Sequence, residues 1–178
     1  MKKTKNIVFV AKSLDGFIAG KNGELDWLET VENPDGNDMG FVALMEEVDA
    51  LVMGRNTFET VVGFGGDWPY AKHVFVLSRS LQHIPTAYQD KVSLLQGDLL
   101  QVLDEIHQKG YHNLYIDGGK TVQEFLEKDL IDELRISTIP ILLGDGISLF
   151  STLPLPMKWN HIKTEVFLNQ IVQSQYTR

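Results

Sequence analysis

The stretch ALVMGRNTFE, residues 50–59, joins a short apolar segment to the start of an amphipathic one. Ala50–Met53 is apolar at every position, which is typical of a strand buried on both faces of a sheet. Gly54 interrupts this run, and Asn56 with Glu59 three residues later matches the capping box that begins a helix. A strand that leads directly into a helix is the repeating unit of a parallel sheet.

The same alternation of strand and helix continues on both sides of this stretch. We predict further strands at residues 6–12, 74–77, 92–95, 114–116 and 134–141. We predict further helices at residues 41–48, between the cap residue Asp98 and Gly110, and at 121–128. Residues 161–167 and 171–176 flank Asn169 and predict a terminal antiparallel hairpin.

These elements predict an α/β fold in a single domain, residues 1–178. We expect a three-layer sandwich, in which a mixed, mostly parallel sheet carries helices on both faces and ends in the antiparallel hairpin.

Composition excludes several classes of protein. The chain has no cysteine, so disulfides, thiolate zinc sites and cysteine nucleophiles are absent, and its five histidines show no metal-ligand spacing. With 24 acidic and 16 basic residues its net charge is −8, and no basic stripe offsets this, so we expect no nucleic-acid partner. The first apolar run, residues 7–11, is too short for a signal peptide or membrane span. We therefore expect a cytoplasmic protein with neither a metal nor a membrane partner.

In open α/β sheets, ligands bind beyond the carboxyl ends of the strands. One such turn is Gly54-Arg55-Asn56-Thr57, where a glycine, helix-start amides and an arginine suit a phosphate or pyrophosphate. The alternative is a capped helix with a surface arginine. Ser78-Arg79-Ser80 places an arginine between two hydroxyls, which suits a ribose phosphate, or else a solvated turn.

A third turn is Asp117-Gly118-Gly119-Lys120-Thr121, whose paired glycines permit close backbone approach to a phosphate or a flat ring. The alternative is a tight turn. The Gly-Lys-Thr ending is similar to a P-loop, but that motif needs a glycine five residues before Gly119, where Leu114 stands. The P-loop is therefore excluded.

Two further features are ambiguous. In the loop Leu14–Ala19, Phe17 and Ile18 could cover a flat ring or tuck into the core. Asp38 stands at the start of the helix that carries Phe41, where a helix cap is the natural role.

Taken in order, these motifs resemble the dihydrofolate-reductase-like superfamily, and within it the C-terminal reductase domain of bifunctional riboflavin-biosynthesis deaminase–reductases. The matching segments extend over residues 7–150. They are Ser13–Ala19, Met53–Glu59, Leu77–Arg79, Asp117–Gly119, and Ile139–Gly146 with Phe150.

The resemblance implies NADPH bound in an extended form across the sheet. It places Ala11 and Ile18 beside the nicotinamide, and Ser78 and Arg79 at the adenosine 2′-phosphate. The diphosphate would be held by Gly54, Arg55, Asn56 and Thr57. The turn formed by Gly118, Gly119, Lys120 and Thr121 would also hold the cofactor.

Asp38 precedes Gly54 by sixteen residues, as the pterin-anchoring acid does in dihydrofolate reductases. The resemblance thus implies a buried, catalytic carboxylate that accepts hydrogen bonds from the ring and assists protonation. The segment before it, Glu32–Asn37, is longer and more polar than in dihydrofolate reductases, which disfavours folate itself.

The resemblance implies an NADPH-dependent reductase of a nitrogen heterocycle, most similar to 5-amino-6-(5-phosphoribosylamino)uracil reductase. A chain without cysteine lacks the zinc deaminase unit, so we expect a stand-alone reductase with a small-molecule substrate. The alternatives are dihydrofolate reductase activity and a non-catalytic NADPH- or nucleotide-binding protein.

We also expect a homodimer, as is typical of stand-alone members of the branch. The terminal hairpin predicts an edge strand, and edge strands tend to be covered or paired. Leu153–Met157 and Trp159 add apolar surface just before it. In the alternative, Met157 and Trp159 fold back onto the core of a monomer.

Overall fold

The computed structural model describes residues 4–178, so the first three residues of the expected domain 1–178 lie outside the described range. The larger strands are β1 (Lys5–Lys12), β3 (Ala50–Gly54), β4 (His73–Leu77), β5 (Val92–Leu95), β6 (Asn113–Asp117), β7 (Glu133–Thr138), β9 (Asn160–Phe167) and β10 (Ile171–Thr177). Two short strands are β2 (Phe17–Ala19) and β8 (Ile147–Ser148). The helices are α1 (Phe41–Glu47), α2 (Arg55–Gly63), α3 (Leu99–Gln108) and α4 (Gly119–Glu127), with 3-10 turns η1 (Asp26–Thr30) and η2 (Thr86–Tyr88).

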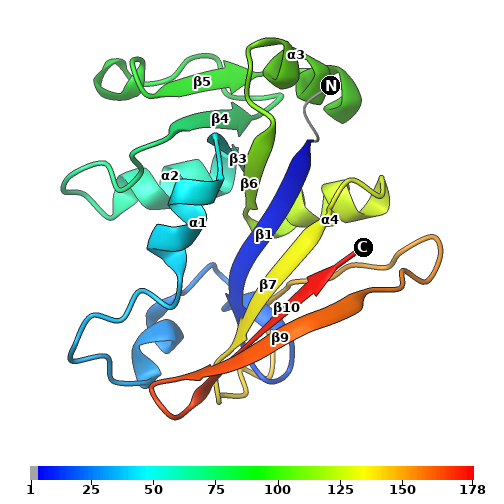
Figure 1. Cartoon of the computed structure of the whole chain (residues 1–178). Coiled ribbons are helices and arrows are strands. Elements are labelled where there is room, and N and C mark those ends of the chain that lie inside the picture. The colour runs from blue at the N-terminus through cyan, green and yellow to red at the C-terminus, as the bar shows by residue number, and fades with distance from the viewer. Residues whose placement is uncertain (1–3) are drawn as a thin grey trace.

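The main sheet has the strand order β5-β4-β3-β6-β1-β7-β10-β9 (Figure 1). Neighbours from β5 to β7 are parallel, whereas β10 pairs antiparallel with both β7 and β9. The predicted mixed sheet with a C-terminal antiparallel hairpin is therefore confirmed. A separate two-stranded sheet joins β2 to β8.

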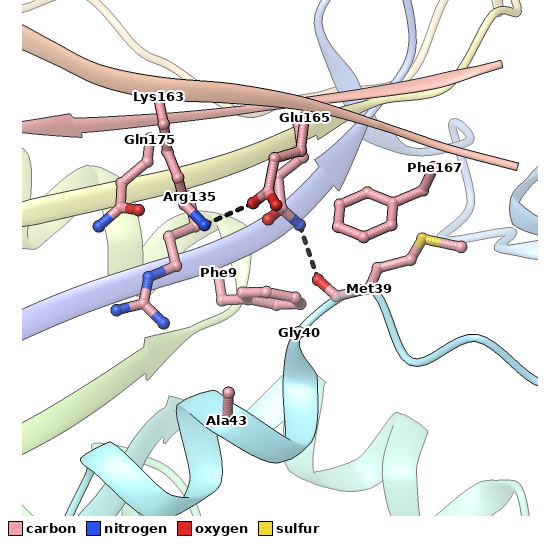
Figure 2. A pocket seen from close by; sticks show the side chains of 10 residues that line it. Phe9, Met39, Gly40, Ala43, Arg135, Lys163, Glu165, Phe167 and Gln175 are labelled. Atoms are coloured by element: carbon pink, nitrogen blue, oxygen red, sulfur yellow. Dashed lines mark hydrogen bonds and ion pairs between the residues drawn. The ribbon is translucent and has the colours of Figure 1, made fainter. Parts of the chain in front are cut away.

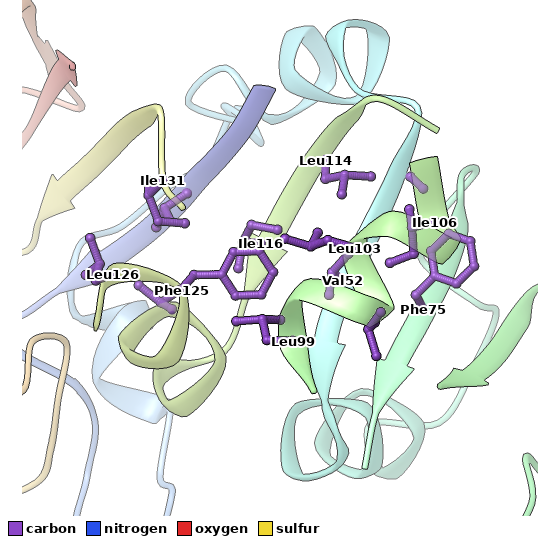
Figure 3. Close-up of a cluster of buried hydrophobic side chains, with 14 of the residues drawn as sticks. Val52, Phe75, Leu99, Leu103, Ile106, Leu114, Ile116, Phe125, Leu126 and Ile131 are labelled. Carbon is purple, nitrogen blue, oxygen red and sulfur yellow. The ribbon is translucent and has the colours of Figure 1, made fainter. Parts of the chain in front are cut away.

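Helices cover both faces of the sheet, because each central strand presents apolar side chains on both sides. One core cluster packs Leu44 of α1 and Phe58 of α2 against β3 and β4. The other packs Leu103 of α3 and Phe125 of α4 against the opposite face (Figure 3). On β6, Tyr115 belongs to the first cluster and Ile116 to the second. Side chains alternate along a strand, so Asp117 is directed to the same face as Tyr115.

Some element boundaries differ from the sequence-based prediction. The predicted capping box at Asn56 is wrong: α2 begins one residue earlier, Gly54 occupies the N-cap, and no side chain caps the helix. Strand β3 leads directly into α2 at Gly54, so Asn56 already lies inside the helix and cannot be its N-cap. The predicted cap at Asp98 is confirmed, since its carboxylate accepts a hydrogen bond from the N–H of Leu100 (3.0 Å).

Two more boundaries shift around the third ligand turn and the last parallel strand. Helix α4 begins at Gly119, two residues before the predicted start. Strand β7 ends at Thr138 rather than at Ile141. Pro140 has no N–H to donate to a strand ladder, which limits how far this strand can extend.

The helices of this fold are short. The longest, α3, has 10 residues, whereas a membrane span needs about 20. No helix within residues 4–178 is long and apolar enough to cross a membrane.

Candidate functional site

The parallel strands end at one edge of the sheet, and three of the predicted ligand turns meet there. Met53 pairs with Asp117 across β3 and β6, and Gly54 pairs with Leu77 across β3 and β4. The turn that follows β3 therefore lies between the turns that follow β4 and β6. Helices α2 and α4 both begin at this edge, so their unpaired N–H groups are available to an anion there.

The turns after β3 and β6 contact each other closely: only glycine fits at Gly118, and the space at Gly54 is tight. A Cβ atom on Gly118 would lie 2.2 Å from Oγ1 of Thr57, and Gly118 has a φ of +88°. A Cβ atom on Gly54 would lie 3.0 Å from Oγ1 of Thr121. These glycines allow the two helix starts to converge on a single location.

Ile18 reaches the same place from the first loop. A Cβ atom on Gly119 would lie 2.5 Å from Cδ1 of Ile18 and 3.6 Å from Cγ2 of Ile147. Both isoleucines belong to the β2–β8 pair. The loop that carries Ile18 is thus an ordered strand packed on the start of α4, which supports the nearness of Ile18 and Gly119 expected at the nicotinamide.

Asp15 fixes this loop to the segment after β7. Its carboxylate accepts hydrogen bonds from Oγ of Ser13 (2.6 Å) and from the N–H groups of Leu143 (3.1 Å) and Gly144 (2.7 Å). These bonds lower the pKa of Asp15 to about 2. The sequence showed Asp15 only as a turn residue, because its two backbone partners, Leu143 and Gly144, lie more than a hundred residues away.

The expected phosphate end contains two arginines with different surroundings. Arg55 pairs with Glu59 (Nε–Oε1, 2.6 Å) and donates to Oγ of Ser80 (3.0 Å). Arg79 is exposed and makes no hydrogen bond or ion pair with any residue from 4 to 178. Ser78 supports this turn by accepting hydrogen bonds from the N–H of Leu81 (2.9 Å) and of Ser80 (3.2 Å). Arg79 is therefore the guanidinium that is free to meet a phosphate.

The remaining predicted cofactor residues differ in exposure. Asn56 and Lys120 are exposed at the two helix starts, whereas Thr121 is buried against Gly54. Ala11 is half-buried in a small cluster that contains Met39. The fold thus brings the turn residues together and places Ala11 at the end of β1, beside them.

The surroundings of Asp38 differ from those implied by the resemblance. The residue is exposed, and its carboxylate accepts hydrogen bonds from the N–H of Val42 (2.7 Å) and of Gly40 (3.3 Å). These backbone hydrogen bonds lower the pKa of Asp38. The expectation of a buried carboxylate is wrong, because α1 begins only at Phe41 and leaves Asp38 on the polar segment before it. Asp38 thus binds an N–H of the first turn of α1, although Gly40 occupies the N-cap position, and the catalytic role stays a prediction.

The acid that does lie inside the site is Asp117, at the carboxyl end of β6. Its carboxylate is partly buried and accepts a hydrogen bond from the N–H of Gly118 (2.8 Å). Burial raises the pKa of Asp117, although hydrogen bonds from Gly118 and Tyr115 act in the opposite direction. Burial and the nearby Asp117 also raise the pKa values of Tyr70 and Tyr115. The sequence analysis assigns the glycine pair a role but none to Asp117, although an acid directly before two glycines at a strand end is visible in the sequence.

A cavity of about 350 Å³ lies between α1 and the β9–β10 hairpin (Figure 2). Its floor contains Phe9 and Phe167, and its cations are neutralised within the protein. Arg135 pairs with Glu133 and Glu47, and Lys163 pairs with Glu165. This cavity suits a polar molecule without net charge better than a phosphate. Within residues 4–178 no three side chains are grouped as metal ligands.

Residues 4–173 match the sequence profile of the RibD C-terminal domain. The chain is also 34% identical over 177 residues to the uncharacterized protein YwjB of Bacillus subtilis, and the match covers 98% of each protein. Among solved structures, a candidate riboflavin biosynthesis protein from Shewanella sp. PV-4 superposes with a TM-score of 0.95. It is 53% identical, and the match covers 98% of each chain.

Two more distant structures show the same fold. One is the diaminohydroxyphosphoribosylaminopyrimidine deaminase/5-amino-6-(5-phosphoribosylamino)uracil reductase of Thermotoga maritima, with a TM-score of 0.71 and 17% identity over 99% of this chain and 57% of that one. The other is dihydrofolate reductase from Enterococcus faecalis complexed with NADP(H). Its TM-score is 0.66 and its identity is 22%, and the match covers 98% of this chain and 96% of that one. At these identities the likeness concerns the fold alone, and it confirms the dihydrofolate-reductase-like architecture.

Proposed function

The chain belongs to the RibD C-terminal domain family, and from that premise we propose that residues 1–178 form a stand-alone NADPH-dependent reductase domain. The substrate that we propose is a flat nitrogen heterocycle, with 5-amino-6-(5-phosphoribosylamino)uracil as the first candidate. In that substrate the hydride would reach C1′ of the open-chain imine. Dihydrofolate reduction and cofactor binding without turnover are the alternatives.

The observation that carries the proposal is the convergence of glycine turns at the carboxyl edge of the sheet. Neither Gly54 nor Gly118 carries a side chain, and none fits at Gly118, so the backbone amides that begin α2 and α4 can approach a diphosphate. The unpaired Arg79 supports a preference for NADPH over NADH, because the two differ by one phosphate. Ala11 and Ile18 would border the nicotinamide, and Asn56, Thr57, Lys120 and Thr121 complete the two turns.

When bound, NADPH supplies the hydride, and the protein supplies orientation and a proton. Reduction of a C=N bond places the hydride on carbon and a proton on nitrogen. We propose that Asp117 donates this proton, since it lies at the carboxyl end of β6 beside the glycine turn, and burial raises the pKa of its carboxyl and so favours the protonated form. Asp38 remains a second candidate for the proton-assisting role.

We also propose a homodimer and a cytoplasmic location. Strand β9 is an edge of the main sheet, and its neighbourhood exposes apolar side chains at Ile162 (53% exposed), Val166 (60%) and Val172 (41%). Met157 and Trp159 instead pack against the core, as in the monomer alternative. The exposed face of β9 and β10 is therefore the surface that we assign to a second copy.

The proposed function is tested by following NADPH absorbance after adding one candidate substrate at a time. We expect NADPH to be oxidised when 5-amino-6-(5-phosphoribosylamino)uracil is added and not when dihydrofolate is added. Oxidation with dihydrofolate alone would establish the first alternative. Binding of NADPH without oxidation by any pyrimidine or pterin would establish the second, and failure to bind NADPH would overturn the proposal.

A further inference from the structure

A second cavity, of about 500 Å³, lies on the sheet face that carries α3 and α4, away from Asp117. Its floor is the surface of β7 and β10, with Leu134, Ile136 and Tyr176. Its outer wall comes from the segment between β8 and β9, with Met157 and Trp159. The volume lies within the range of about 300–1,000 Å³ that is usual for small-molecule sites. The reductase reaction proposed above uses none of these residues.

The cavity is polar at one end and apolar along its length. Lys12 and Thr138 are paired residues at the carboxyl ends of β1 and β7, and both line the cavity. Two residues back along β7, on the same face, comes Ile136, followed by Leu134. A ligand that fills the cavity would therefore meet a cation and a hydroxyl at one end and mostly hydrocarbon elsewhere. The exception on the floor is Ser174, beside Ile136, whose hydroxyl is hydrogen-bonded to Thr164 (3.0 Å).

The charge of Lys12 is not neutralised within the described chain. Its ammonium makes one long hydrogen bond, to the carbonyl of Ser13 (3.4 Å), and no ion pair with residues 4–178. The two cations of the first cavity, Arg135 and Lys163, are both paired with carboxylates. In a chain of net charge −8, an unpaired lysine at the end of an apolar cavity provides a local attraction for an anion.

The wall of the cavity is held in place from outside. The guanidinium of Arg178 lies 5.4 Å from the ring centroid of Trp159 and pairs with Asp129. Met157 and Trp159 also pack against the buried core. The cavity is therefore formed before a ligand arrives, which lowers the entropic cost of binding.

We propose that this cavity binds a small amphipathic anion, namely an aryl or alkyl carboxylate or sulfonate. Its charged head would meet Lys12 and Thr138, and its apolar body would lie between the β7–β10 floor and Trp159. This site is separate from the reductase site and does not depend on the function proposed for it. Ser174 and Tyr176 share a face of β10 with Val172, so the cavity borders the surface assigned to a second copy.

The test uses the full chain, saturated with NADP⁺ so that nucleotide turns are blocked, and two fluorescent probes. 8-Anilinonaphthalene-1-sulfonate has an aromatic body and an anionic head, whereas N-phenyl-1-naphthylamine has a similar body without the charge. We expect the sulfonate to bind once per chain by calorimetry. Lys12→Met keeps the aliphatic stem and should weaken sulfonate binding by about tenfold, while the neutral probe binds both proteins equally.

Two further variants locate the site. Ser174→Phe projects a ring into the cavity and should abolish binding of both probes, with folding checked by circular dichroism. Leu142→Ser, which removes a 69% exposed leucine outside the cavity, should change nothing. If Ser174→Phe does not fold, the comparison of the charged and the neutral probe on Lys12→Met still tests the proposed anion site.

Three results would overturn the proposal. The sulfonate could bind only when NADP⁺ is left out, which would place it in the nucleotide site. Its affinity could be the same in Lys12→Met as in the unmodified chain. Its binding could appear only on dilution to monomers, which would show that a second copy of the chain fills the cavity.

Discussion

At the scale of single residues, Arg79 is the most direct test of the cofactor assignment. Arg79→Ala should weaken NADPH binding by roughly 10- to 100-fold, because one charge-assisted contact to phosphate contributes about 1.5–3 kcal/mol. Binding of NADH should be nearly unchanged. Calorimetric titration of both cofactors measures this, and an equal loss for the two would place Arg79 away from the 2′-phosphate.

The two neighbouring glycines should respond differently to substitution. Gly119→Val should abolish NADPH binding in a folded protein. The φ of Gly119 lies outside the left-handed region, and the one close contact of the added Cβ is with the flexible end of Ile18, since Ile147 lies at an ordinary van der Waals distance. Gly118→Ala should lower the melting temperature instead, because of its positive φ and the contact with Thr57. Fluorescence binding and thermal unfolding separate these effects. Normal NADPH binding by Gly119→Val would show that the glycine pair only forms a turn and does not hold the cofactor.

Asp117 should govern proton donation. Asp117→Asn should lower turnover by about 100-fold or more while NADPH affinity stays within a few-fold. In the unmodified enzyme the rate should fall as pH rises through the raised pKa of Asp117, because only the protonated carboxyl can donate. A pH–rate profile of both proteins shows this. An identical profile in Asp117→Asn would assign the proton to another group.

Asp38 offers the matched comparison, because it is an acid near the site with the opposite environment. If Asp38 assists protonation, Asp38→Asn should reduce turnover far more than NADPH affinity. If it only caps α1, turnover should be unchanged and the loss should appear in thermal unfolding. Steady-state kinetics together with a melting curve distinguish the two roles.

At the scale of elements, Asp15 connects the loop after β1 to the segment after β7. Asp15→Asn should speed hydrogen exchange at the N–H groups of Leu143 and Gly144, after correction for intrinsic rates, while the β-sheet core exchanges as before. The replacement amide lacks the charge that strengthens these bonds.

The same contact has a defined pH dependence. The pKa of Asp15 is lowered from 3.8 to about 2 in the folded chain. The stabilisation that its carboxylate gives to this contact is therefore complete above pH 4 and is lost as pH falls toward 2. Exchange at Leu143 should rise in that window in the unmodified protein and stay level in Asp15→Asn. A flat response in both would show that the contact does not hold the loop.

At the scale of the whole molecule, we expect light scattering at micromolar concentration to give about twice the chain mass of 20.1 kDa. Val166→Asp should produce a monomer with an unchanged circular dichroism spectrum. Val42→Asp is the matched control, since both valines are 60% exposed but Val42 lies on α1. A mass near that of one chain in the unmodified protein would exclude the dimer.

The sequence alone was enough to predict most of the elements and the character of the turns. Apolar runs such as Ala50–Met53 are typical of strands buried on both faces of a parallel sheet, and the glycine that ends this run favours a strand. Glycines at strand ends and the pairing of arginine with hydroxyls are local features, which explains why these turns could be proposed as cofactor turns from the sequence. The terminal hairpin was likewise encoded by alternation around Asn169.

Only the tertiary structure decided which turns meet and how each acid is solvated. Strand order places Thr57 against Gly118, and neither residue indicates this in its own segment. Burial of Asp117 and exposure of Asp38 depend on where α1 begins and on what packs against β6. The unpaired Lys12 and its cavity depend on the return of residues 149–159 across the sheet. Solvation and charge pairing are set by neighbours distant in sequence, so local patterns cannot report them.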